Sequence, residues 1–141
     1  MSPSLQEVGL AVKRLQWRHH RAANTALAAV GLSLPQWDVL RHLRSLPDAS
    51  LHDLAVLTFQ TDQSMGALAV RMVERGLLER AGGPGRAVRH RLTEQGEQAR
   101  RAGGEVMDAV LRDSFAHLSP QQLTQLYELL LIAGAASPSD D

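Results

Sequence analysis

The residues of this sequence whose types could do chemistry are hydrogen-bonding and cationic side chains in the middle of the chain. Gln63 and Ser64 follow Thr61, whose hydroxyl is suited to cap the start of a helix. A glutamine in the first turn of such a helix can bond an adenine through two hydrogen bonds. The same helical face continues to Ala67 and Arg71, and the small Ala67 would let the helix approach a duplex closely. This pattern favours the reading of base edges in the major groove of DNA.

A second group consists of arginines around a turn rich in glycine and proline, residues 82–86. Arg86 would lie at the tip of that turn, where an arginine can enter the narrow, electronegative minor groove. Arg89 and Arg91 alternate with apolar residues, so they would share one face of a strand and could reach phosphates. Taken alone, such arginines often do no more than blunt the edge of a hairpin. Beside a candidate reading helix, contact with DNA is the better interpretation.

The charge of the chain is distributed unevenly. Its formal net charge is zero, yet residues 71–101 hold eight arginines against four acids, and residues 102–141 hold one arginine against six acids. DNA affinity follows the cations that face the phosphates and not the total charge. A zero net charge therefore does not exclude a nucleic acid partner, although a solvated charged surface is the alternative explanation.

Other classes of function are disfavoured by what the sequence lacks. Cysteine is absent, which excludes thiol redox sensing, disulfides and zinc sites with cysteine ligands. No apolar run reaches the roughly 18 residues that a membrane span needs, and the first residues do not resemble a signal peptide. We find no nucleophile paired with a base and no phosphate-binding glycine loop before a helix. The expectation is a soluble, cytoplasmic protein that is not an enzyme and needs no cofactor.

Helix and turn signals divide the chain into six helices and one hairpin. The first helix has a stripe of apolar and small residues from Leu5 to Ala26, and the last, which starts after Ser119, is apolar on every side at 129–132. Both are expected in a subunit interface. Between them the sequence predicts helices capped by Ser33, Ser50 and Thr61, strands at 77–81 and 88–93, and a helix at 94–115 weakened in its middle by Gly103 and Gly104.

Three short or medium helices followed by a two-stranded hairpin define a winged helix-turn-helix. The predicted fold class is mainly α with a small β-hairpin wing and with N- and C-terminal dimerisation helices. The apolar residues predicted to form the buried side of the third of these helices are Met65, Leu68, Ala69 and Met72. We expect a single domain over residues 1–141, with a DNA-binding lobe at 33–96 and dimerisation helices at 5–30 and 97–135.

The chain resembles the MarR-type (multiple antibiotic resistance regulator) family over about residues 5–135. The resemblance rests on the order and spacing of four segments: 31–40 (GLSLPQWDVL), Leu54-Ala55, 73–80 (VERGLLER) and 86–96 (RAVRHRLTEQG). It implies a homodimer held by the first and last two helices. It also implies palindromic operators read by two wings and two recognition helices, with repression that a small ligand relieves.

Three positions depart from the usual pattern of that family. Its wing usually has an aspartate where this chain has Pro84, and its recognition helix usually has an arginine where this chain has Ala67. These differences bear on the strength of DNA binding and on the half-site that is preferred. Phe59 replaces a glycine that is common in the turn before the recognition helix.

The resemblance also implies an effector pocket between the dimerisation helices and the lobe. Trp17, His20, Trp37 and His42 lie on elements that could line it, and packing is the alternative role, above all for Trp37. The six histidines show no spacing typical of a metal site. His90 is expected to pack at the base of the wing.

The predicted function is that of a sequence-specific DNA-binding transcriptional regulator, a repressor in preference to an activator, acting as a homodimer. Two alternatives stay open: a winged-helix module that binds protein and has lost DNA binding, and a metal-responsive regulator. The sequence does not identify the effector, the operator or the regulated genes.

Overall fold

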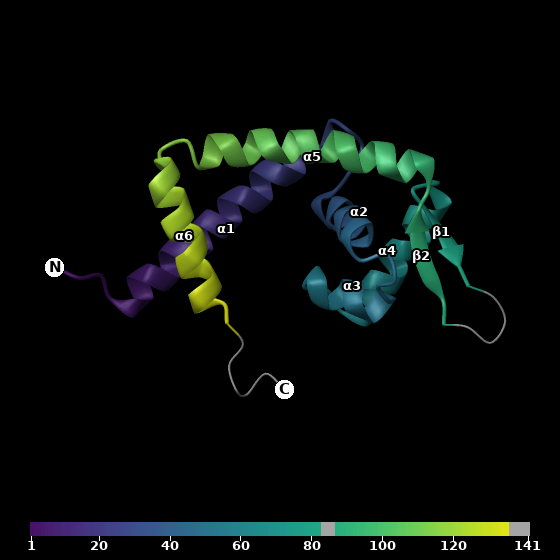
Figure 1. Ribbon diagram of the computed structural model, residues 1–141, viewed down its shortest axis with the longest axis horizontal. Coiled ribbons are helices and arrows are strands. Elements are labelled where there is room, and N and C mark those ends of the chain that lie inside the picture. Colours follow the sequence, from purple (N-terminus) through teal and green to yellow (C-terminus); the bar gives the residue numbers. More distant parts are fainter. Residues whose placement is uncertain (83–86, 136–141) are drawn as a thin grey trace. The chain divides into compact units, whose positions relative to one another are not determined.

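The computed structural model describes residues 1–82 and 87–135. The chain divides by its internal contacts into two compact units, Met1–Val110 and Leu111–Asp141. The second unit holds the end of α5 and α6 (Pro120–Ala133), and the first holds the remaining elements. These are α1 (Leu5–Ala28), α2 (Leu34–Ser45), α3 (Leu51–Leu57), α4 (Asp62–Glu74), β1 (Leu78–Ala81), β2 (Arg89–Leu92) and most of α5 (Glu94–Ser114) (Figure 1). The prediction of a mainly helical chain with one hairpin is confirmed.

The helices begin at the predicted caps. Ser33, Ser50 and Ser119 each form a capping box with the residue three positions later. The Thr61 hydroxyl accepts a hydrogen bond of 3.1 Å from the backbone N–H of Ser64. These bonds satisfy N–H groups that the start of a helix leaves without a partner.

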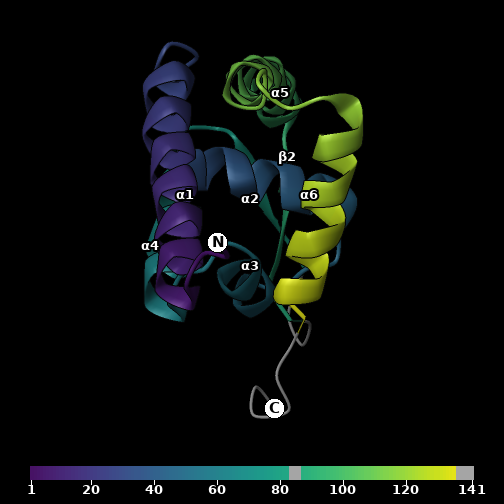
Figure 2. The same ribbon diagram turned by 90° about the vertical axis from the view of Figure 1, so that its left-hand side faces the viewer.

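The core of the first unit lies between α2, α3 and α4. Leu40, Leu54, Met65 and Met72 are completely buried, one or two from each of these helices. The buried side predicted for α4 is confirmed, because Met65, Leu68, Ala69 and Met72 are all buried. Helix α2 also contacts α1 and runs across its direction (Figure 2).

The hairpin is an antiparallel pair in which Leu78 lies opposite Leu92 and Arg80 opposite His90. Its strands are one or two residues shorter than predicted. Beyond the ladder, the Thr93 backbone N–H still donates to the carbonyl of Leu77, and its hydroxyl donates to the carbonyl of Gly76. His90 is buried at the base of the hairpin, as predicted, and this burial lowers the pKa of its imidazole.

Helix α5 runs without a break through its glycines, so the predicted weak point does not interrupt it. The glycines allow close approach instead. A Cβ at Gly103 would lie 2.3 Å from Cδ1 of Trp37, and a Cβ at Gly96 would lie 2.0 Å from the carbonyl oxygen of Leu77. At Gly104 a Cβ would meet no atom within 4 Å. The first unit therefore packs directly on the α5 backbone at two points.

Candidate nucleic-acid interface

The exposed side of α4 presents the residues predicted to read bases. Thr61, Gln63, Ser64, Ala67 and Arg71 are all exposed, away from the buried side of the helix. Gln63, Ala67 and Arg71 follow one another at four-residue spacing and so form one row along the helix. The Gln63 and Arg71 side chains form no hydrogen bond or ion pair with another described residue. Their polar groups are thus available to a partner.

The turn between α3 and α4 is fixed by hydrogen bonds among its own side chains. The Thr58 hydroxyl donates to the carbonyl of Leu54 (2.6 Å), and Gln60 Nε2 donates to the Thr58 hydroxyl (2.9 Å). The Ser64 hydroxyl then donates to Gln60 Oε1 (3.1 Å). Because this bond uses the Ser64 hydrogen, the hydroxyl retains its lone pairs and faces a partner as an acceptor.

His52 and Asp62 form an ion pair between the starts of α3 and α4. Nδ1 of His52 lies 2.9 Å from Oδ1 of Asp62, and both side chains are well exposed. The hydrogen bond with Asp62, followed by the attraction of its charge, raises the pKa of His52. No local motif predicts this pair, since ten residues separate the partners. When protonated, His52 offsets the negative charge at the start of the candidate reading helix.

The arginines of the hairpin differ in what they bond. Arg91 Nε lies 2.6 Å from Oε1 of Glu79, in a pair whose members are both exposed. Arg89 is half-buried and donates to a neighbouring carbonyl. The exposed Arg80 makes no side-chain bond with any residue in the described part of the chain. Arg86, the predicted wing tip, lies outside the described residues, as does Pro84.

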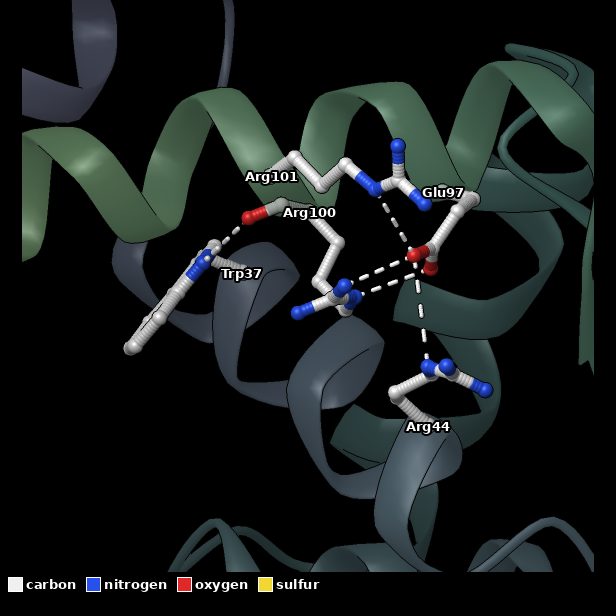
Figure 3. Close-up of polar contacts among 5 residues, drawn as sticks. All are labelled: Trp37, Arg44, Glu97, Arg100 and Arg101. Carbon is white, nitrogen blue, oxygen red and sulfur yellow. Dashed lines mark hydrogen bonds and ion pairs between the residues drawn. The ribbon is translucent and has the colours of Figure 1, made fainter.

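A cluster of arginines at the start of α5 surrounds Glu97 (Figure 3). Arg100 donates to the two oxygens of Glu97 at 2.8 and 2.7 Å, and Arg101 donates to one at 3.2 Å. Arg44 of α2 approaches the same carboxylate at 3.9 Å. The hydrogen bonds from Arg100, first of all, lower the pKa of Glu97 to about 2.

Arg75 belongs to the scaffold as well. Its Nη2 donates to the carbonyl of Gly31 (2.7 Å) and its Nη1 to the side chain of Gln36 (3.1 Å), so it ties the end of α4 to the start of α2. Four of the eight arginines between positions 71 and 101 therefore bond carboxylates or distant parts of the chain, namely Arg75, Arg91, Arg100 and Arg101.

A hollow of about 490 Å³ is lined by residues of α4 and of the hairpin segment. Val70 and Val73 of α4 and Val88 and His90 from the hairpin side make its lining mostly apolar. Arg80 adds a guanidinium group to the lining. Glu74 adds a carboxylate, so the lining carries a group of each charge and the hollow suits a largely apolar molecule.

Of the four residues predicted to line an effector pocket, two lie on α1 and two on α2. On α1 the ring of Trp17 stacks on that of His20, with centroids 6.0 Å apart and planes at 15°. On α2 the guanidinium of Arg41 lies 4.9 Å from the centre of the Trp37 ring. Burial lowers the pKa of the half-buried His42. Their part in binding an effector stays a prediction.

The described residues contain neither a metal-binding cluster nor a membrane-spanning helix. Among residues 1–82 and 87–135, no three histidine, aspartate or glutamate side chains are arranged to hold a metal ion. Within the same ranges, none of the helices combines the length and the apolar character needed to cross a bilayer.

Helices α3 and α4, joined by the four residues 58–61 and followed by an antiparallel hairpin, form a winged helix-turn-helix. In such a motif the second helix of the pair is the one that enters the major groove, and the exposed row lies on that helix. Residues 30–87 match the model of the MarR family. The predicted resemblance to the MarR family is therefore confirmed over residues 30–87, the segment that carries this row.

Solved structures share this fold over nearly the whole chain. CouR of Rhodococcus jostii, bound to p-coumaroyl-CoA, gives a TM-score of 0.82 at 23% identity, covering 96% of this chain and 99% of that one. A MarR family protein of Mycobacterium tuberculosis in complex with DNA gives 0.77 at 23%, covering 95% and 100%. A mutant MarR of E. coli complexed with operator DNA gives 0.79 at 18%, covering 94% and 99%. No curated protein sequence is significantly similar to this chain.

Proposed function

We propose that this chain is a sequence-specific DNA-binding transcriptional regulator. The observation that carries the proposal is the exposed row of Gln63, Ala67 and Arg71, whose polar groups bond no other described residue. The opposite side of the helix is completely anchored in the core. A helix held in this way can enter the major groove, which is about 12 Å wide. The relatives solved with DNA, from M. tuberculosis and E. coli, support this assignment.

The proposed contacts follow from the side chains that are available. Gln63 donates and accepts at a base edge, Ser64 accepts from a base amino group, and Arg71 bonds a guanine or a phosphate. Thr61 and Arg89 would bond phosphates at the sides of the groove. Arg91 would do the same after leaving Glu79, which costs little because exposed ion pairs contribute at most about 1 kcal/mol. Arg86 would enter the minor groove.

A homodimer is proposed because α1 and α6, each considered by itself, expose large apolar side chains. Examples are Val8, Val12 and Trp17 on α1, and Leu130 and Ile132 on α6. Such surfaces mark protein interfaces. In this proposal residues 5–30 and 97–135 dimerise and residues 33–96 form the DNA-binding lobe. Two-fold symmetry then presents two reading helices to palindromic half-sites about one helical turn apart.

We further propose that a small ligand controls binding and that the bound protein represses. CouR, with the same fold, binds p-coumaroyl-CoA. In this chain the hollow beside Val70 and Arg80 suits a largely apolar molecule, and a ligand there would touch both the reading helix and the hairpin. The residues around Trp17 and Trp37 are the second candidate site. A regulator of chromosomal DNA acts in the cytoplasm, and the proposal includes no enzymatic activity.

The proposal is tested by titrating the full chain with duplexes selected from a random pool, at several salt concentrations. We expect log affinity to fall linearly and steeply with log salt. Arg86→Ala should weaken binding and reduce that slope by about one, without changing the dimer. Arg101→Ala is the matched control because Arg101 bonds Glu97.

The same titration tests the two alternatives. Affinity at background level in low salt would favour a winged-helix module that binds protein. A metal-responsive regulator requires zinc to change the DNA affinity or the melting temperature, and we expect neither change.

A further inference from the structure

The turn before the reading helix holds Phe59 in a backbone conformation that suits glycine. Its φ is +58°, and it is the one residue other than glycine with a positive φ in residues 1–82 and 87–135. The N–H of Gln60 donates to the carbonyl of Ala55 (2.8 Å) and that of Phe59 to Val56 (3.3 Å), which is a Schellman ending for α3. Any residue with a Cβ is strained there, and a phenylalanine gains nothing over glycine from the backbone.

Packing does not compensate for this strain. The side chain of Phe59 is 97% exposed, more than any other large apolar side chain of the described chain except the terminal Met1. The turn itself is held by the bonds from Thr58 to Leu54 and from Ser64 to Gln60. A rigid turn therefore presents an aromatic ring to solvent at a cost in backbone strain that no burial of the ring offsets. A contact outside this chain is the benefit that could offset that cost.

The position of Phe59 limits what that contact can be. It lies two residues before Thr61, the cap of α4, so their Cα atoms are at most about 7 Å apart. A duplex that receives the first turn of α4 would therefore lie within reach of the ring. The side chains next to it along the chain, Thr58, Gln60 and Thr61, are polar, which fits a groove walled by phosphates better than an apolar protein surface.

We propose that Phe59 is a specificity-determining residue whose ring packs against the C5-methyl group of a thymine at the edge of each half-site. Phenylalanine is one of the side chains that make apolar contact with that methyl group in the major groove. This inference rests on the proposed DNA-binding function and adds a base preference to it. It also gives the reading face an apolar contact beside its sparse polar ones.

The test removes the ring and the methyl group separately. Operators are selected from a random pool with the wild-type protein, and each thymine is replaced in turn by uracil, which lacks only the methyl group. At one position per half-site we expect the wild type to lose about fourfold in affinity, the effect of one buried methyl group. Phe59→Gly should bind the unsubstituted operator at least fourfold more weakly and should not respond to that uracil.

Melting temperature separates this role from a structural one. Phe59→Gly should melt at a higher temperature than the wild type, because the strain is relieved, while its DNA affinity falls. Phe59→Asn is the second variant, since asparagine tolerates the same backbone conformation without the flexibility of glycine or the ring. It should match Phe59→Gly in DNA binding. Because no charge is removed, the salt dependence should be unchanged in both variants.

The inference and the proposed function fail in different ways. If the wild type binds no duplex at low salt, the proposed function is wrong. If the wild type binds and both variants bind equally well, or if no uracil substitution separates them from the wild type, the thymine contact is wrong.

Discussion

Two groups of arginines in the first unit differ in what they bond. Arg100 and Arg101 at the start of α5 share the carboxylate of Glu97, and the carbonyl of Arg100 also accepts the indole N–H of Trp37 at 3.2 Å (Figure 3). On α4, Arg71 is exposed and bonds no described side chain. The charges of the first group are paired with a carboxylate on their own helix, whereas the charge of Arg71 is available to a partner.

This difference shows why a count of arginines overstates a DNA-binding surface. Of the seven described arginines between positions 71 and 101, four bond carboxylates or distant parts of the chain. What is left on the candidate interface is a small set of separate groups, mainly Arg71, Arg80 and Arg89 within the described residues. Specificity then depends on how exactly those few groups are placed, and so on the scaffold that holds them.

The largest expected effect tests the scaffold at its closest contact. Gly103→Ala should lower the free energy of unfolding by about 2 kcal/mol, because the new methyl group would overlap the ring of Trp37. Gly104→Ala is the adjacent control and should raise it by up to about 1 kcal/mol through helix propensity. Urea denaturation measures both. Equal results for the two variants would mean that Trp37 does not pack tightly on α5.

The next effect separates the two groups of arginines. Arg71→Ala should weaken operator binding about tenfold, as expected for one base or phosphate contact, and should leave unfolding unchanged. Arg101→Ala should leave operator binding unchanged. Affinities from a gel shift or anisotropy titration check both. A loss of affinity in Arg101→Ala would contradict the distinction between arginines that are paired within the chain and arginines that are available to DNA.

A smaller effect concerns acid stability. The pKa of Glu97 is lowered from 4.5 to about 2, so its stabilising contribution is present above pH 4.5 and is lost as the pH falls from 4.5 towards 2. The contribution at neutral pH should be at most about 1 kcal/mol, since water screens this partly exposed cluster. Glu97→Gln should therefore be less stable at neutral pH and equal to the wild type near pH 2. An equal difference at both pH values would contradict the ion-pair cluster.

The smallest effect tests the electrostatics of the reading face. The pKa of His52 is raised, so its positive charge is gained as the pH falls through a value above its usual one. The affinity for DNA should then rise about twofold on going from pH 8 to about pH 6, because a single exposed charge is screened by salt. His52→Gln should lose this part of the pH dependence. The same pH dependence in that variant would assign it to another group.

The predictions that the structure confirms rest on patterns among residues close together in the sequence. Ser33, Ser50 and Thr61 cap helices through residues three positions away, and the buried side of α4 repeats at helical spacing. The glycine and proline between two short apolar segments were enough to predict the hairpin. In each case the decisive residues lie within one or two helical turns of each other.

The contacts that sequence alone did not reveal are those between distant residues. Arg75 bonds Gly31, 44 positions away, and His52 bonds Asp62 without any motif spacing. Gly103 was predicted only to weaken α5 through its low helix propensity, whereas in the structure it allows the close approach of Trp37. Phe59 was visible as an unusual residue, but its cost became clear only from its backbone angle and exposure.

Gly96 and Gly103 have a mechanical consequence. They are seven residues apart, which is two turns, so both contacts lie on one side of α5. At these two points α5 contributes no side chain of its own, so its backbone lies directly against the carbonyl of Leu77 and the ring of Trp37. A displacement of α5 would therefore reach the turn at Leu77, which leads into the hairpin, and α2, without being absorbed by a side chain of α5. The helix would then transmit its displacement to the reading lobe as a rigid element.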